Sequence, residues 1–397
     1  MSNLKQLGLT LSTLIILTSS LILAACDSSS TPTPVPVGTL RPTFTPGAPE
    51  QPTTEPTRTT APTSTPAPSS ETRPPVAGTE PAAVSSPSPS PAATGAGRPL
   101  PELGGTLLFP IFDATDQTYH IYEMDLASGR TKKFIEEASQ PAVTSNGERI
   151  AWRSWDQEQR GLLSRLMNGT DTWQMISFSE AARPDWAPDN QQFVFPSRQE
   201  PDRQSRLYLF TGTGEEQFIE LRTHGSPIIG RTPAYLPDGS IVYQGCAESL
   251  CGLFLIDADG ANPRRLTEFK DDTAPAVSPD GEKIAYMSKI SGYWQVNVVN
   301  ADGTAQQSLT DDWYWNGLPA WSPDGRYIVF VSTRDENWPD NFQLSENTDF
   351  RLWIMDATGE NQRPLSDSTF RLDGVPAGVP QDEAWGWIEE RMLWLSE

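Results

Sequence analysis

Short runs of alternating apolar and polar residues fill the chain from about residue 100 onward, and turn-forming residues separate them. Runs such as ERIAWRS, QQFVFPS, EKIAYMS and RYIVFVS are rich in the branched and aromatic residues that favour strands. A second set, RLYLFTGTG, LFLIDADG, WQVNVVNADG and RLWIMDATG, indicates a strand followed by a tight turn. Segments such as NPRRLTE and AQQSLTD predict one more short strand. The pattern predicts an all-β protein with hardly any helix.

One phrase precedes each group of strands. It starts at Pro141, Pro184, Pro233, Pro275 and Pro319 and reads PAVTSNG, PDWAPDN, PAYLPDG, PAVSPDG and PAWSPDG. We interpret it as the end of an inner strand and its hairpin turn, because proline fixes φ near −65°, aspartate accepts nearby N–H groups and glycine accepts positive φ. The copies recur every 40-odd residues, so four antiparallel strands per repeat predict a β-propeller.

The serine of PAWSPDG raises the question of a catalytic turn. Ser322 is replaced at the matching position of the other copies by Thr144, Ala187, Leu236 and Ser278. No histidine lies near it in the sequence, and its flanks lack the GxSxG elbow of hydrolases. A nucleophile is not needed five times, so the phrase is predicted to be architectural.

The phrase, followed by a strand and then DATG or DADG, resembles the TolB-type propeller repeat, a relative of the WD repeat. The resemblance covers about residues 100–397. It implies a partner among the proteins of the bacterial cell envelope. In the repeat alignment the third position holds Trp186, Tyr235 or Trp321, and we expect these rings to pack between blades rather than to bind a ligand.

The two ends of the repeat region predict how the ring closes. Residues 104–112, 119–129 and 131–136 match the second, third and fourth strands of a blade, with no first strand before them. Residues 383–388 align on the PAW of the phrase and are predicted to supply that first strand. Six blades follow, the sixth shared by both ends. The segment RMLWLS is also compatible with an additional second strand, which leaves seven blades as an alternative.

The first hundred residues are not propeller. Residues 1–25 have a short positive start and an apolar run, which are typical of a secretory signal, and Leu23 to Cys26 resembles a bacterial lipobox. We therefore expect Cys26 to carry a lipid that anchors the chain to the cell membrane from outside the cytoplasm; an uncleaved membrane anchor is the alternative. Residues 26–100 are rich in Pro, Thr, Ser and Ala and predict a disordered linker. Residues 101–397 form the predicted propeller.

The net charge and the cysteines limit which partners and bonds the chain can have. The formal net charge of −22 argues against nucleic acid as a partner. Once Cys26 is assigned to lipid, Cys246 and Cys251 remain, and their spacing predicts a structural disulfide across a hairpin end rather than a CxxC redox motif. No cofactor or metal is expected, because phosphate, dinucleotide and calcium-loop motifs are missing from the sequence.

The irregular loops on the face opposite the phrase are the candidate binding surface. Loops on a rigid scaffold commonly carry function. The candidate residues are Trp313, Tyr314, Trp315, Trp338, His224, Arg334 and Asp335. The aromatic residues among them suit a platform for a glycan, peptide or protein segment, and the alternative is that one or two pack the loops against their neighbours.

These features predict a non-catalytic scaffold that binds a protein or ligand of the cell envelope. The rivals are an envelope hydrolase or lyase acting on glycans and a solute sensor. His120 falls in a predicted strand and is expected to be structural, which leaves His224 for general-base chemistry. Buried acids gathered around His224 would favour the enzyme. The oligomeric state is not predicted.

Overall fold

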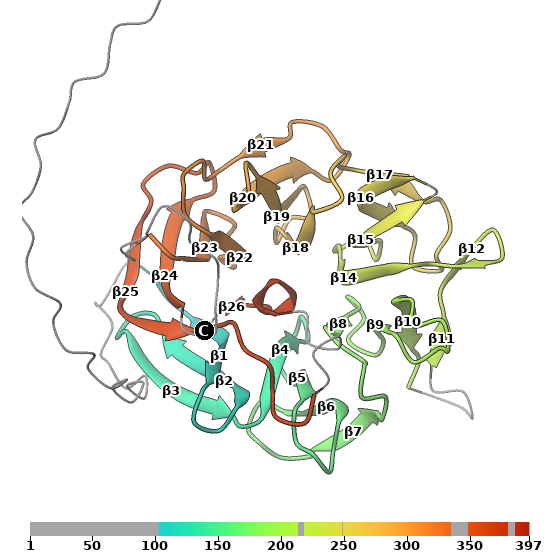
Figure 1. Cartoon of the computed structure of the whole chain (residues 1–397), viewed down its shortest axis with the longest axis horizontal. Helices are drawn as coiled ribbons and strands as arrows, with labels where there is room; N and C mark the ends of the chain where they lie inside the picture. The colour runs from blue at the N-terminus through green and yellow to red at the C-terminus, as the bar shows by residue number, and fades with distance from the viewer. Residues whose placement is uncertain (1–102, 213–217, 248, 335–347, 380–385, 397) are drawn as a thin grey trace, which may run out of the picture. The chain divides into compact units, whose positions relative to one another are not determined.

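A computed structural model describes residues 103–212, 218–247, 249–334, 348–379 and 386–396. These residues form six four-stranded antiparallel sheets arranged as blades around a ring (Figure 1). The six-bladed β-propeller predicted from the sequence is confirmed. No helix in these ranges is long and apolar enough to cross a bilayer.

Each blade is numbered in chain order and given from its inner to its outer strand. Blade 1 is β4 (Ala138–Val143), β5 (Arg149–Ser154), β6 (Gly161–Leu166) and β7 (Trp173–Ile176); blade 2 is β8 (Asp185–Trp186), β9 (Phe193–Ser197), β10 (Arg206–Phe210) and β11 (Phe218–Glu220). Blade 3 is β14 (Gly230–Tyr235), β15 (Ile241–Ala247), β16 (Leu250–Ile256) and β17 (Arg264–Arg265); blade 4 is β18 (Thr273–Val277), β19 (Lys283–Ile290), β20 (Tyr293–Asn300) and β21 (Gln307–Ser308). Blade 5 is β22 (Asn316–Trp321), β23 (Tyr327–Ser332), β24 (Asp349–Asp356) and β25 (Arg363–Arg371); blade 6 is β26 (Leu393–Leu395), β1 (Thr106–Asp113), β2 (Thr118–Asp125) and β3 (Arg130–Ile135). Outside the blades lie the hairpin of β12 (Arg222–Thr223) and β13 (Ser226–Pro227) and the 3-10 helix η1 (Trp387–Glu389).

This strand order divides the ring into two faces. The turns between the first and second strands carry the repeated phrase, and they open on the same side as the turns between the third and fourth strands. We call this side the PDG face. The hairpins between the second and third strands and the connections from one blade to the next open on the opposite side, which we call the loop face.

The PDG turns are built from internal hydrogen bonds. In blade 5 the Asp324 carboxylate accepts hydrogen bonds from the Ser322 hydroxyl (2.6 Å) and the Arg326 N–H (3.1 Å), and Gly325 has φ of 70°. The Ser322 hydroxyl in turn accepts the Tyr327 N–H at 2.9 Å. Its oxygen is therefore engaged as donor and acceptor in the turn, which agrees with an architectural role for the phrase.

The aromatic residue in the third position of the phrase packs between blades. Trp321 is 7% exposed, and its indole N–H donates to the carbonyl of Ala276 in the inner strand of the preceding blade at 2.9 Å. Trp186 makes the matching bond to the carbonyl of Ala142 at 3.3 Å. Tyr235 is also buried. The expectation that these rings form inter-blade core is confirmed, and the indole N–H adds a directional bond to the packing.

Each copy of the phrase is preceded by a bulge that the sequence pattern did not predict. The residue before the first proline has positive φ in all five copies; these residues are Gln140, Arg183, Thr232, Ala274 and Leu318. In blades 1, 3, 4 and 5 the pairing of the first two strands also shifts register here. Positive φ in a residue other than glycine costs of order 1 kcal/mol and persists where its surroundings hold it. All five side chains are at most 3% exposed.

The ring closes differently from the prediction. Residues 387–389 form η1 rather than an inner strand, and the first strand of blade 6 is β26, whose Leu393 and Leu395 pair with Leu108 and Thr106. The predicted strand over residues 383–388 is therefore wrong where it is described; 383–385 lie outside the described residues. The physical reason is the burial of Trp387. Its side chain is 2% exposed and its ring centroid lies 5.0 Å from that of Phe350, so this segment packs into the core and does not pair as a strand. Because RMLWLS supplies β26, the seventh blade is also wrong.

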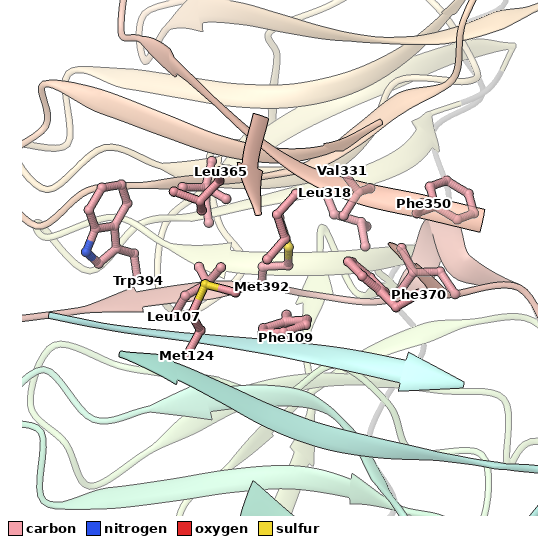
Figure 2. Close-up of a cluster of buried hydrophobic side chains, with 14 of the residues drawn as sticks. Leu107, Phe109, Met124, Leu318, Val331, Phe350, Leu365, Phe370, Met392 and Trp394 are labelled. Carbon is pink, nitrogen blue, oxygen red and sulfur yellow. The ribbon is translucent and has the colours of Figure 1, made fainter. Parts of the chain in front are cut away.

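The largest buried cluster lies at this closure. Figure 2 shows side chains of blades 5 and 6 meeting with residues of the C-terminal segment; the labelled residues are Leu107, Phe109, Met124, Leu318, Val331, Phe350, Leu365, Phe370, Met392 and Trp394. The seam between the first and last parts of the propeller is thus closed by apolar packing as well as by the β1–β26 ladder.

Candidate functional site

Trp313 is the candidate aromatic residue that the structure exposes. It follows β21 in the connection from blade 4 to blade 5, and 76% of it is exposed. Its ring meets that of Tyr293, at the tip of the adjacent hairpin, edge to face at 5.9 Å. The tryptophan therefore lies exposed on the loop face, and the ring of Tyr293 contacts one edge of it.

The two aromatic residues after it are turned inward. Trp315 is half-buried, with its ring 6.4 Å from that of Trp387 and the Lys289 ammonium 5.8 Å above it. Tyr314 is also half-buried, and its carbonyl accepts a hydrogen bond from the amide of Gln295 at 3.0 Å. The packing alternative therefore holds for Trp315, and the three residues do not form one flat platform.

The remaining candidates do not gather around Trp313 as a set. Arg334 pairs with Asp312 at 2.7 Å, and its guanidinium lies over the ring of Trp353. It therefore ties the connection that carries Trp313 to blade 5. Asp335 and Trp338 lie outside the described residues. His224 is at the tip of the β12–β13 hairpin, which lies at the outer rim beside blade 2, whereas Trp313 follows β21 of blade 4 (Figure 1).

The structure adds exposed apolar residues that the sequence analysis missed. Leu250 is 53% exposed, Phe269 is 62% exposed and Ile290 is 38% exposed. With Trp313 they occupy two hairpin ends and two blade connections on the loop face of blades 3 and 4. We call these four residues the loop-face patch. Their signal in the sequence is an apolar residue at a turn position, as in AESLC, TEFKDD and SKISGY.

The two connections that carry aromatic members of the patch are braced in the same way. In the connection from blade 3 to blade 4, the fully buried Asp272 accepts the N–H of Phe269 at 3.1 Å. In the next connection, Asp312 accepts the N–H of Tyr314 at 3.0 Å, beside Trp313. A carboxylate under each turn fixes the backbone while the aromatic side chain faces solvent.

The disulfide supports the other end of the patch. Cys246 and Cys251 are bonded across the end of the β15–β16 hairpin, as predicted, and Leu250 precedes Cys251. The Arg265 guanidinium donates to the carbonyls of Cys251 and Glu268, each at 2.6 Å. It therefore ties the hairpin of Leu250 to the connection of Phe269.

The C-terminal segment occupies part of the channel of the propeller. After β25, residues 372–379 run along the loop face, where the carbonyl of Ala377 accepts the Gln157 amide at 2.7 Å. Further along the chain, the short coil of η1 lies at the middle of the ring (Figure 1). The Arg391 guanidinium spans two blades, donating to the carbonyls of Pro184 (2.8 Å) and Pro233 (2.9 Å) and to the Asp185 carboxylate (2.7 Å).

Further charges are buried beside this segment. Glu389 pairs with Arg231 at 3.4 Å. Glu390 is 2% exposed, and burial raises its pKa to about 7, although Arg153 and Arg183 act in the opposite direction. Burial lowers the pKa of Arg153 to about 10 and that of Arg183 to about 9. Among the described channel residues the acids are opposed by arginines, and no histidine lies with them.

The propeller resembles known proteins in its sequence and in its fold. A family model described as the TolB beta propeller domain (PD40) matches residues 220–347. An uncharacterized protein of Agrobacterium fabrum is 32% identical over 166 residues, which are 41% of this chain and 54% of that protein. The Tol-Pal system protein TolB of Rhizorhabdus wittichii is 38% identical over 99 residues, 25% of this chain and 18% of that protein.

The propeller of this chain is similar to that of TolB. The crystal structure of TolB from Acinetobacter baumannii superposes with a TM-score of 0.57 at 17% identity, covering 74% of this chain and 67% of that one, which shows the shared fold. The chain spans about half the length of the Agrobacterium relative and about a fifth of the Rhizorhabdus TolB. The likeness concerns the propeller repeats.

One group of acids and a histidine in this TolB-like propeller has metal-ligand spacing. The ligand atoms of Asp113, Asp116 and His120 lie within 4.8 Å of one another. His120 is in β2 and 3% exposed, and its Nδ1 accepts the N–H of Glu137 at 3.0 Å. The proton of the neutral ring is therefore on Nε2, which faces Asp116 at 3.4 Å. A metal-binding histidine donates its second N–H instead of accepting there, so the group fits a structural clamp.

Proposed function

We propose that the TolB-like propeller is a non-catalytic scaffold that binds a protein partner of the cell envelope through the loop-face patch. The observation that carries the proposal is the patch itself. Of the seven large exposed apolar residues in the described ranges, five lie at hairpin ends or in blade connections of the loop face, and the other two, Trp173 and Ile219, lie in outer strands. Exposed apolar residues gathered on one face mark interaction sites.

The chemistry of the patch favours a protein over a glycan. Sugars are bound by flat aromatic faces with polar neighbours, and burial of Trp315 leaves Trp313 as the aromatic residue exposed in its connection. Leucine, isoleucine and phenylalanine beside it instead suit the apolar centre of a protein interface. The braced turns hold these side chains before binding, which lowers the entropy lost on association.

The geometry does not favour the enzyme. His224 lies on an exposed hairpin at the rim, and the acids of the channel face arginines rather than a histidine. The criterion set from the sequence, buried acids around His224, is not met among the described residues.

Location in the envelope rests on the sequence and the relatives. Residues 1–25 and the lipobox at Cys26 support export and a lipid anchor, and the relatives include proteins named for the Tol-Pal system. Leu103 and Gly104 lie beside Ser322 and Asp324 on the PDG face. Replacement of Cys26 by serine is expected to move the protein from the membrane fraction to the soluble fraction, with Cys246→Ser as the control that stays.

Site-specific photocrosslinking in the full-length chain tests the binding face. A photoreactive phenylalanine analogue at position 269, 290 or 313 is expected to capture the same partner. The same analogue at Ile219, an exposed apolar residue in an outer strand, is expected to capture none. The purified partner should then bind the native chain and lose affinity with Phe269→Ser. Capture at position 219 alone, or binding indifferent to Phe269, would refute the assignment.

A further inference from the structure

A second site lies on the other face, inside the channel. A cavity of about 260 Å³ is lined by inner strands of blades 2 to 5 and by residues 391–394. Its rim includes Pro279 and Pro323 of two PDG turns, which are exposed to solvent, and Arg183 and Arg391 also line it. The cavity therefore leads from the PDG face to the charged interior of the ring.

The two arginines of the cavity differ in one respect. Arg391 has carbonyl acceptors and is neutralised by Asp185 at 2.7 Å. Arg183 is 3% exposed, and its Nε and Nη1 have no hydrogen-bond acceptor among the described residues. A buried guanidinium with unpaired N–H groups is unfavourable in a low-dielectric interior. Because Arg183 lines the cavity, a ligand there could supply the missing acceptor.

The nearby acids do not supply an acceptor for the unpaired Arg183 nitrogens. Glu389, Glu390 and Asp185 act on Arg183 through space. Glu389 pairs with Arg231 and Asp185 pairs with Arg391, while one carboxyl oxygen of Glu390 is itself buried without a partner. The Nε and Nη1 groups of Arg183 are therefore left for a further acceptor.

The backbone holds Arg183 in this position. It is the residue before the first proline of the phrase in blade 2, with φ of 43°, and its N–H donates to the Gln140 side-chain carbonyl at 2.8 Å. The same bulge position holds Ala274 in blade 4 and Leu318 in blade 5. One side of the channel thus carries the cation, while Leu318, Val277 and Trp321 form an apolar wall to the same cavity.

We propose that this cavity binds a small organic monocarboxylate, with the carboxylate on Arg183 and an apolar body against the wall of blades 4 and 5. One guanidinium with unpaired N–H groups matches a single carboxylate head group. A carboxylate also accepts hydrogen bonds from a guanidinium in a planar geometry. Two sources have this chemistry: a free carboxylic acid and the C-terminal carboxylate of a peptide that enters from the PDG face.

Titration of the full-length protein with phenylacetate tests the proposal, with phenylacetamide as the uncharged probe of equal shape. Binding is followed by calorimetry and by tryptophan fluorescence, since Trp321 and Trp394 line the cavity. Phenylacetate is expected to bind at least tenfold more tightly than the amide. A dipeptide ending in a free phenylalanine carboxylate, compared with its amide, distinguishes the peptide source: tighter binding of the dipeptide than of phenylacetate assigns the site to chain ends.

Variants assign the binding to Arg183. Arg183→Met is expected to weaken phenylacetate binding by about tenfold or more, the usual loss for a charged hydrogen bond, whereas the exposed Arg130→Gln leaves it unchanged. Val277→Asp, which places a negative charge at the partly exposed apolar wall, should weaken it without touching Arg183. This second variant decides the matter if Arg183→Met fails to fold. Equal affinity for phenylacetate and its amide, or native affinity in the folded variants, would overturn the proposal.

Discussion

The two faces of the ring are made by the same six blades but differ in what their turns contain. On the PDG face, aspartate, serine and glycine satisfy one another inside each turn, as Ser322 and Asp324 do. On the loop face, buried aspartates such as Asp272 hold the backbone while apolar side chains face solvent. The repeated turns of the PDG face are therefore structural, whereas the loops that depart from the repeat expose the side chains available for binding.

The bulge before the phrase differs from both faces. Its backbone has positive φ in all five copies, but its side chain changes from copy to copy.

The largest effect should separate the buried Trp387 from the exposed Trp313. Trp387→Ala is expected to lower the free energy of unfolding by about 3–5 kcal/mol, because it empties a packed site beside Phe350. Trp313→Ala should change it by less than about 0.5 kcal/mol, since the ring is exposed. Urea unfolding followed by circular dichroism measures both. Equal losses would mean that Trp313 is structural as well.

The buried carboxyl group of Glu390 predicts that the free energy of unfolding depends on pH. Burial raises the pKa of Glu390 from 4.5 to about 7, against Arg153, Arg183 and hydrogen bonds from Ser139 and Gln140. Between these pH values the folded protein holds a proton that the unfolded chain has released. The free energy of unfolding should therefore fall as pH rises from 4.5 to 7, by roughly 3 kcal/mol from this group.

Glu390→Gln removes that titration and should flatten the fall. Chemical denaturation at pH 5 and pH 8 compares the variant with the native chain. The exposed Glu136→Gln serves as the control that keeps the native slope. A slope that persists in Glu390→Gln would place the titrating group elsewhere.

A loop-face substitution should affect binding alone. Phe269→Ser removes an exposed aromatic member of the patch, so it is expected to weaken partner binding by roughly 2 kcal/mol, about 30-fold in Kd. Its melting temperature should stay at the native value. Calorimetry with the partner found by crosslinking gives the first quantity and thermal unfolding the second. A lowered melting temperature with intact binding would reverse the roles assigned to the faces.

The matching PDG-face substitution should affect stability alone and by the least. Asp324→Ala removes the acceptor of three hydrogen bonds in the blade 5 turn, one of them from the exposed Arg326 side chain, and is expected to lower the free energy of unfolding by about 1 kcal/mol. Partner binding should be unchanged. Urea unfolding and calorimetry on one preparation test both statements, and any loss of partner affinity would show that the binding surface reaches the PDG face.

The fold was predictable where a residue's role depends on local geometry. The PDG turns, the inter-blade Trp186 and Trp321 and the disulfide follow from turn chemistry and spacing. The strand that closes the ring was not predictable, because the sequence patterns of EAWGWI and RMLWLS are both typical of strands. The choice depends on whether Trp387 finds a core site, which is a property of the assembled ring.

The candidate site was predictable only in part for the same kind of reason. Trp313 and Trp315 stand two residues apart in one aromatic run, and contact with Trp387 from the far end of the chain decides which one is buried. Phe269 and Arg183 carried no motif at all. Their roles depend on their surroundings in the folded chain. Phe269 is exposed above a hydrogen-bonded turn, and Arg183 lines a cavity with two of its nitrogens unpaired.

The ladder between β1 and β26 also sets an order of events. Leu107 pairs with Trp394, so the earliest strands of the propeller wait for one of the last segments to be synthesised. Pairing across so long a stretch of chain is slow, because the loop must close before its contacts form. The ring is therefore expected to close after the hairpins of the individual blades have formed.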